Sequence, residues 1–232
     1  MTHLLIKLAS AVAVLYGLTA CTAKAPSPAW ELEAKSASDR ATKAYLRGES
    51  KIAQVEWQKA FEEVSATGQP SAMARMALLQ CAVQMAALEM TDCARYQRYA
   101  AGAEAPEQAY ARYLQALHTA ADVPFLPVAQ QPVAAFVLAG KGSEPLSALP
   151  PGPALSQLTA AAVALRAGLI GRAAIQQAGQ VAAEQGWRRA VMAWLAVERR
   201  LALVAGDDAV ARSIELRLQV LAEDQRSQEI KK

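Results

Sequence analysis

The sequence predicts an all-α protein built from antiparallel helical hairpins, with a Pro-rich connector in the middle. Alanine is abundant and only 6% of residues are aromatic, a composition that favours helices because alanine loses no side-chain entropy in them. Apolar residues recur every three or four positions along most of the chain, and no long stretch alternates polar and apolar residues as a sheet would. With 53% hydrophobic residues in 232, the chain can bury a substantial core.

Residues 1–20 have the organisation of an export signal and are set apart from the fold. A short basic segment ends at Lys7. The apolar stretch that follows, residues 8–18, is too short to span a bilayer as a helix. We therefore expect a signal peptide over residues 1–20.

The end of this signal, Leu18-Thr19-Ala20-Cys21, resembles the lipobox of bacterial lipoproteins. The resemblance implies that Cys21 is lipidated and that residues 21–27 are a tether, with the acyl chains giving a stable hold on the membrane. Thr22, standing where aspartate would retain such a protein at the inner membrane, implies sorting to the outer membrane. The alternative is an ordinary secretory signal, with Cys21 incidental.

Residues 28–121 are expected to form an N-terminal helical-hairpin region. Ser27 and Pro28 suit the N-cap and first position of a helix over 28–47, which Gly48 ends. An amphipathic helix over 50–66 follows. The helix expected at 71–89 is apolar almost all round, which is typical of a central position. Two more helices are expected, one from Thr91 or Asp92 to 101 and one from Pro106 onward.

A Pro-rich connector, residues 122–153, holds seven of the chain's 11 prolines. Proline removes a backbone donor and clashes with the preceding turn, so long helices are excluded there. We expect a short helix at 133–138 and a joint between two helical halves, with Phe125 and Leu126 packed on the core.

Residues 154–232 are expected to form a C-terminal helical-hairpin region. Its apolar residues, among them Trp187 and Trp194, repeat every three to four positions in a heptad-like seam. The four helices expected span 154–168, 170–185, 187–205 and 208–223.

Small and aromatic residues of the first hairpin resemble the tetratricopeptide repeat. The set Gly48, Ala53, Trp57, Ala60 and Phe61 is similar to the repeat's turn glycine, its small residue at the helix crossing and its closing aromatic-alanine-large sequence. The chain departs from the repeat at Ser65, where the family has its closing proline, and it lacks the early glycine of the first helix. The resemblance implies a tetratricopeptide-like α-solenoid. The alternative is an irregular helical bundle, which needs small residues at crossings for the same packing reason.

Cys81 and Cys93 form an even pair, which in an oxidising compartment predicts a disulfide. A chain turn near residues 89–91 counts against it, because Cys81 would then lie much farther from the turn than Cys93, unless the first helix ends early. Two buried free cysteines are the alternative. The segments from Cys81 to Ala94 and from Ala105 to Ala111 also resemble a group of proteobacterial lipoproteins with no assigned activity, and this resemblance favours the disulfide.

The search for chemistry is mostly negative. No spacing of histidine, cysteine and carboxylate predicts a metal site or a cofactor, and we expect no enzyme activity. His118 is expected to be a solvated histidine at a helix C-terminus rather than a general base. The segment Arg95–Tyr99 mixes cations with aromatics, but a net charge of only +3, part of it in the signal peptide, argues against nucleic acid.

These observations together predict a lipoprotein held in the outer membrane, on its periplasmic side, through Cys21. Its helical hairpins would act as a scaffold that binds an envelope protein or peptide. Repeat folds use the concave face of their first helices, so Arg40 and Lys43 are the candidate contacts. The alternatives are a structural lipoprotein or an inhibitor of a periplasmic enzyme, and a peptidoglycan-acting enzyme, which would need a buried glutamate of raised pKa.

Overall fold

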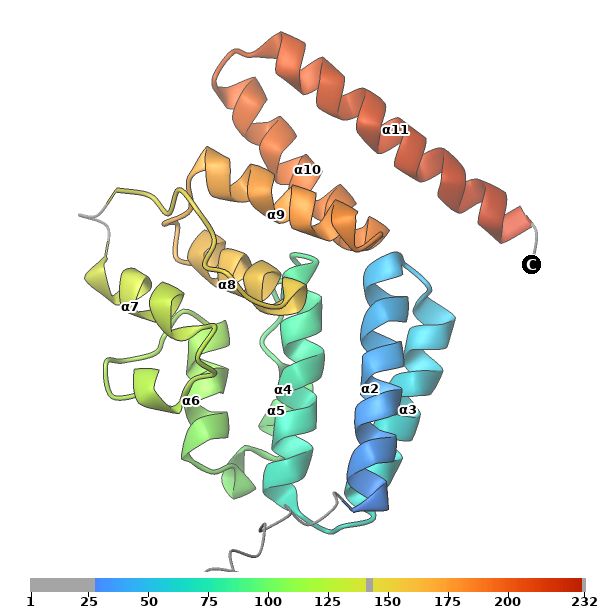
Figure 1. Ribbon diagram of the computed structural model, residues 1–232, viewed down its shortest axis with the longest axis vertical. Coiled ribbons are helices and arrows are strands. Elements are labelled where there is room, and N and C mark those ends of the chain that lie inside the picture. The colour runs from blue at the N-terminus through green and yellow to red at the C-terminus, as the bar shows by residue number, and fades with distance from the viewer. Residues whose placement is uncertain (1–27, 141–143, 231–232) are drawn as a thin grey trace, which may run out of the picture.

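The computed structural model describes residues 28–140 and 144–230, with side chains through residue 223, and these residues form an all-helical protein, as predicted. The predicted signal peptide, Cys21 and the tether lie outside the described residues. Figure 1 shows that the described part of the chain is a succession of helices, with no sheet in it.

Helices α2 (Ala29–Arg47) and α3 (Ser50–Ser65) form a tight antiparallel hairpin. Gly48 makes the turn with a φ of 91°, a conformation that glycine adopts without strain. Small residues such as Ala41 and Ala60 are fully buried and let the two backbones approach closely. The hairpin expected from the sequence is therefore confirmed, with boundaries within about two residues of those predicted.

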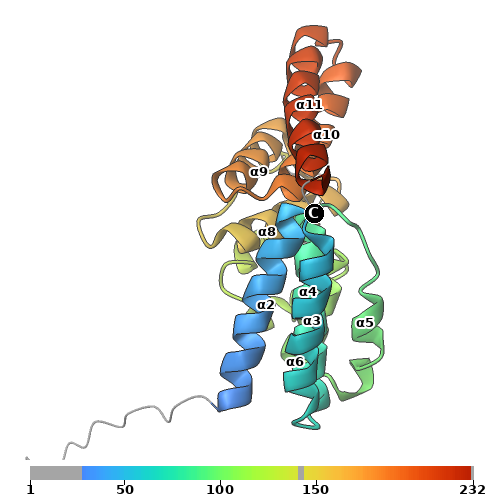
Figure 2. The same ribbon diagram turned by 90° about the vertical axis from the view of Figure 1, so that its right-hand side faces the viewer.

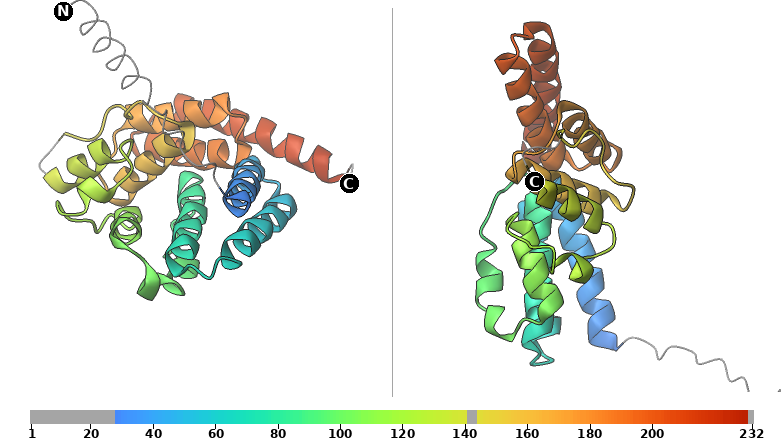
Figure 3. Two further views of the ribbon diagram at one scale, coloured as in Figure 1. Left: turned by 60° about the horizontal axis from the view of Figure 1, so that its bottom comes forward. Right: turned by 90° about the vertical axis from the view of Figure 1, so that its left-hand side faces the viewer.

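Helix α4 (Pro70–Ala86) lies at the centre of the molecule. It contacts α2 and α3 on one side and α6 and α8 on others, and Figures 1 and 3 show the first hairpin and the α6 region on opposite sides of it. Nine of its residues are buried. Its nearly uniform apolar character is thus explained by neighbours all round it. Beyond the first hairpin the helices do not continue as regularly stacked pairs, because the main neighbours of α4 come from later in the chain.

The chain after α4 departs from the sequence expectation. The helix ends at Ala86, and Leu88 turns the backbone with a φ of 59°. The expected helix to residue 101 is replaced by the four-residue α5 (Ala94–Gln97) and a 3₁₀ turn, η2 (Ala100–Gly102). This early end removes the geometric objection to a disulfide. The Sγ atoms of Cys81 and Cys93 lie 1.92 Å apart and the Cα atoms 5.4 Å apart.

Helix α6 (Ala105–Leu114) begins with a capping box between Glu104 and Glu107. It ends sooner than expected, so His118 is not at a solvated helix terminus. The expectation of a solvated His118 was wrong: the side chain is only 5% exposed and its Nε2 lies 2.9 Å from the carbonyl oxygen of Ala134. A left-handed residue, Ala116, turns the chain inward after the helix.

The Pro-rich connector is fastened to the body at several points. It contains η3 (Val123–Phe125) and α7 (Gln131–Ala139). Leu126 packs on the core as expected, whereas Phe125 is 49% exposed and its expected burial was wrong. Leu146 exchanges backbone hydrogen bonds of 2.8 Å with residues 169 and 171, which forms an isolated parallel bridge to Ile170.

The second half of the chain forms four helices in succession: α8 (Ala154–Arg166), α9 (Arg172–Glu184), α10 (Arg188–Val204) and α11 (Asp208–Ile230). Each packs on the next. Helix α11 runs seven residues past the expected end at residue 223. Figure 2 shows α10 and α11 projecting beyond the rest of the molecule.

Several long-range hydrogen bonds join the two halves. The Trp194 indole donates to the carbonyl of Ala86 at 3.1 Å, and the Thr159 hydroxyl lies 3.4 Å from the carbonyl of Ala82. The Arg166 guanidinium donates to the carbonyl of Leu114 at 3.1 Å. One continuous buried cluster runs through both halves.

Replacing Gly102 by alanine is expected to lower the free energy of unfolding by about 1–3 kcal/mol, because overpacking a rigid contact strains the backbone. A Cβ at this position would lie 2.3 Å from the Cβ of Pro70. Urea denaturation of Gly102→Ala and of the control Gly179→Ala would test this. A Cβ at Gly179 meets its nearest neighbour at 3.8 Å, so that variant should be no less stable than wild type. Equal effects of the two changes would contradict the packing assignment.

Replacing Asp122 by asparagine is expected to destabilise the fold by about 1–3 kcal/mol at neutral pH. The Arg112 guanidinium forms two hydrogen bonds with this buried carboxylate and holds its pKa well below its usual range. The unfolded chain then takes up the proton at a higher pH than the folded one, so the stabilisation is present above about pH 4 and is lost as the pH falls below it.

Denaturation of wild type and Asp122→Asn should therefore show a smaller difference in free energy of unfolding near pH 3 than at pH 7. The exposed Lys35–Asp39 pair supplies the control, since Asp39→Asn should change stability by less than about 1 kcal/mol. The same difference in free energy of unfolding at both pH values would contradict a role for the ionised Asp122.

Candidate functional site

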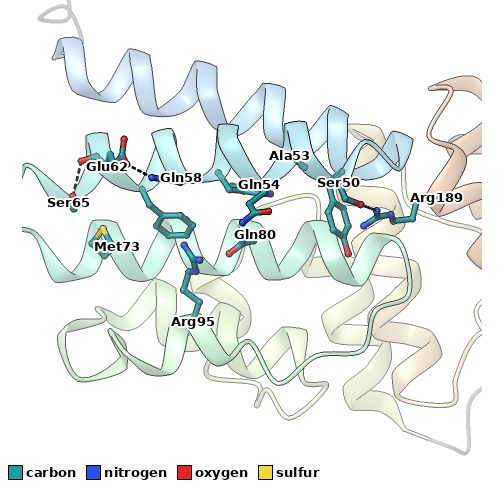
Figure 4. Close-up of a pocket in the computed structure, with 13 residues that line it drawn as sticks. Ser50, Ala53, Gln54, Gln58, Glu62, Ser65, Met73, Gln80, Arg95 and Arg189 are labelled. Carbon is teal, nitrogen blue, oxygen red and sulfur yellow. Dashed lines mark hydrogen bonds between the residues drawn. The ribbon is translucent and has the colours of Figure 1, made fainter. Parts of the chain in front are cut away.

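An open groove of about 550 Å³ lies between α3 and α4. Figure 4 shows residues of both helices facing one another along it, with Arg95 of α5 at its side and Arg189 of α10 at one end. With Tyr45 of α2, five separate elements build one surface.

The floor of the groove is aromatic and apolar. Trp57 and Phe61, one helical turn apart on α3, are buried to 4% and 7% exposure, with their ring centroids 6.3 Å apart. Ala53 lies one turn before them, and Met73 faces them from α4. The apolar face that packs α3 on the rest of the protein therefore also forms the floor, because the groove runs along the edge of this face.

Glutamine side chains line the groove above this floor. Gln54 and Gln58 come from the exposed side of α3, and Gln80 comes from α4. Figure 4 shows Gln54 and Gln80 pointing toward one another between the helices. Each primary amide carries two donors and one acceptor, so the lining can pair with both kinds of backbone group of a ligand.

Arg95 lines the groove beside Phe61. Its guanidinium carbon lies 4.1 Å from the centroid of the Phe61 ring, a cation–π contact that orients an exposed side chain. In the described part of the chain no carboxylate lies within ion-pair distance of this guanidinium. Its position depends on Cys93, two residues earlier, whose link to Cys81 ties α5 to α4.

Arg189 lines the end of the groove beside Ser50. Like Arg95 it stacks on an aromatic ring, but its charge is balanced by a carboxylate. It stacks on Tyr45 at 4.1 Å, donates to the Ser50 hydroxyl at 2.6 Å and lies 3.6 Å from the Glu89 carboxylate. Burial, together with the nearby Glu89 carboxylate, raises the pKa of the Tyr45 hydroxyl, so tyrosine stays neutral there. Among the described residues, the groove consequently has a carboxylate partner for Arg189 and none for Arg95.

The residues chosen from the sequence as contacts lie outside this groove. Arg40 on α2 donates through Nε to Glu56 on α3 at 2.9 Å and through Nη1 to Ser36 at 2.6 Å, so it ties the hairpin together. Lys43 is exposed on α2. Their role as partner contacts, like the lipidation of Cys21 outside the described residues, stays a prediction.

Sequence reasoning missed the groove because its parts were assigned separately. Trp57 and Phe61 were assigned to a tetratricopeptide-like hairpin, and Arg95 to a segment considered as a nucleic-acid contact. The signal that could have joined them is the Cys81–Cys93 pair, because a bond between α4 and the start of α5 brings Arg95 back over the hairpin.

Two further carboxylates, those of Glu107 and Glu62, have structural partners. The buried Glu107 carboxylate accepts from Arg75 at 2.8 and 2.9 Å and caps α6. Glu62 accepts from Gln58 at 2.8 Å. Among the described residues, no group of three or more histidine, cysteine or acidic side chains is placed to hold a metal ion. Nor does any helix there have the length and apolarity needed to cross a membrane.

Comparisons of the chain with protein-family models, with curated proteins and with solved structures found no match. The groove between α3 and α4 is therefore interpreted from its own residues.

Proposed function

We propose that this protein is a lipid-anchored scaffold of the bacterial envelope, attached to the outer membrane through Cys21 on the periplasmic side, and that it binds another envelope protein. The lipobox-like sequence before Cys21 supports the location. The groove between α3 and α4 supports the binding role and supplies its contact surface.

The observation that carries this proposal is the chemistry of the groove lining. A buried aromatic floor with amide and guanidinium groups above it resembles the sites that proteins use to bind peptides, where apolar pockets give affinity and a few polar groups give orientation. The nearest carboxylates, Glu62 and Glu89, already have partners in Gln58 and Arg189. The lining is suited to holding a ligand rather than to moving protons.

Crosslinking in living cells tests this proposal at the level of single residues. A photoreactive amino acid at Gln58, on the groove, is expected to give a discrete adduct with one envelope protein. The matched control is Gln180 on α9. Both glutamines are exposed and both donate to a glutamate four residues later, at 2.8 and 3.1 Å. A third position, Lys43, tests the face of α2 that the sequence indicated.

The expected adduct should disappear when Cys21→Ala removes the lipid anchor. Equal adducts from positions 58 and 180 would mean that the groove has no special role, and an adduct from position 43 alone would place the contact on α2. No adduct from any of the three positions would contradict the scaffold proposal.

A further inference from the structure

We infer that the groove binds an extended peptide segment and that an acidic side chain of this segment sits against Arg95. The inference rests on the proposed function and adds the conformation of the ligand, its charge and the place of its acidic side chain. It follows from the two guanidinium groups that line the groove and from the amides between them.

The amide lining favours an extended peptide over a helix. A helix satisfies its own backbone N–H and C=O groups, so it would cover the amides of Gln54 and Gln80 without bonding them. An extended segment has free backbone donors and acceptors on both edges. The two amides point toward one another over the apolar floor, where such a backbone would run (Figure 4).

The carboxylates around the two arginines determine which arginine the acidic side chain faces. Arg189 already faces Glu89 at 3.6 Å and donates to Ser50. Arg95 stacks on Phe61 at 4.1 Å and, in the region that the structure describes, has no carboxylate partner. Stacking on the ring leaves the edge of the guanidinium open to a ligand, and the N–H donors along this edge match a carboxylate.

The distance between the two cations sets the length of the segment that spans them. Ser50, beside Arg189, and Phe61, beside Arg95, are 11 positions apart on α3. At about 1.5 Å per helical residue this is roughly 16 Å. An extended chain advances about 3.3 Å per residue and covers the distance in roughly five residues. Apolar side chains on one face of the segment would lie on Trp57 and Phe61, next to the acidic residue.

Peptide display tests the inference directly. The probe is a library of random decapeptides, selected against the full-length protein in detergent micelles. Wild-type protein is expected to enrich peptides with aspartate or glutamate at one fixed position and apolar residues near it. Selection against Arg95→Glu should enrich lysine or arginine at that position. A wild-type peptide should bind Arg95→Gln roughly tenfold more weakly or worse, because a charge-assisted hydrogen bond is lost.

Arg98→Gln supplies the matched control, since Arg98 ends the same short helix, is exposed and does not line the groove. Its binding should stay within about twofold of wild type, and unchanged circular dichroism of both variants would show that each folds. Enriched peptides without a fixed acidic position, or acidic peptides that bind Arg95→Gln as well as wild type, would overturn the inference and leave the scaffold proposal standing. Selection of no peptide at all, together with no crosslink from position 58, would overturn both.

Discussion

The structure depends above all on the burial of α4. A helix that is apolar on nearly every face must have neighbours on every face, and the chain supplies them from both of its halves. The last-turn carbonyls of a buried helix also need donors. Trp194 and Thr159, far along the sequence, reach the carbonyls of Ala86 and Ala82. Replacing either donor while the halves stay packed would leave a buried carbonyl without this partner.

The same helix connects the core to the groove. One face of α4 presents Met73 and Gln80 to α3, and this face is where the groove opens. Another face carries Cys81, whose bond to Cys93 brings α5 and Arg95 back beside the hairpin. The groove thus needs no dedicated domain, because it forms where a short disulfide-linked segment meets the edge of the first hairpin.

The long helices could be predicted because their signal is local. The period of apolar residues and glycine stops such as Gly48 determine a helix whatever surrounds it. The segments after α4 and α6 could not, because non-glycine residues in left-handed conformation, Leu88 and Ala116, turn the chain there. Tertiary packing selects those turns, so His118 was wrongly expected to be solvated. The candidate site could not be predicted for the same reason. Trp57 and Phe61 recur with the helical period whether the edge of their apolar face is covered by another element or open to solvent.

The proposed binding site depends on one covalent bond, and the proposed location is one in which that bond can form. Helix α5 has only four residues, too few to be stable alone, and its tertiary neighbours are α4 and η2. The bond from Cys93 to Cys81 compensates for this weakness by fixing the start of α5 to the central helix α4. Such bonds persist in oxidising compartments and not in the cytosol. In a protein exported with the signal proposed here, Arg95 would be held in place beside the groove only after the protein reaches the compartment of its partner.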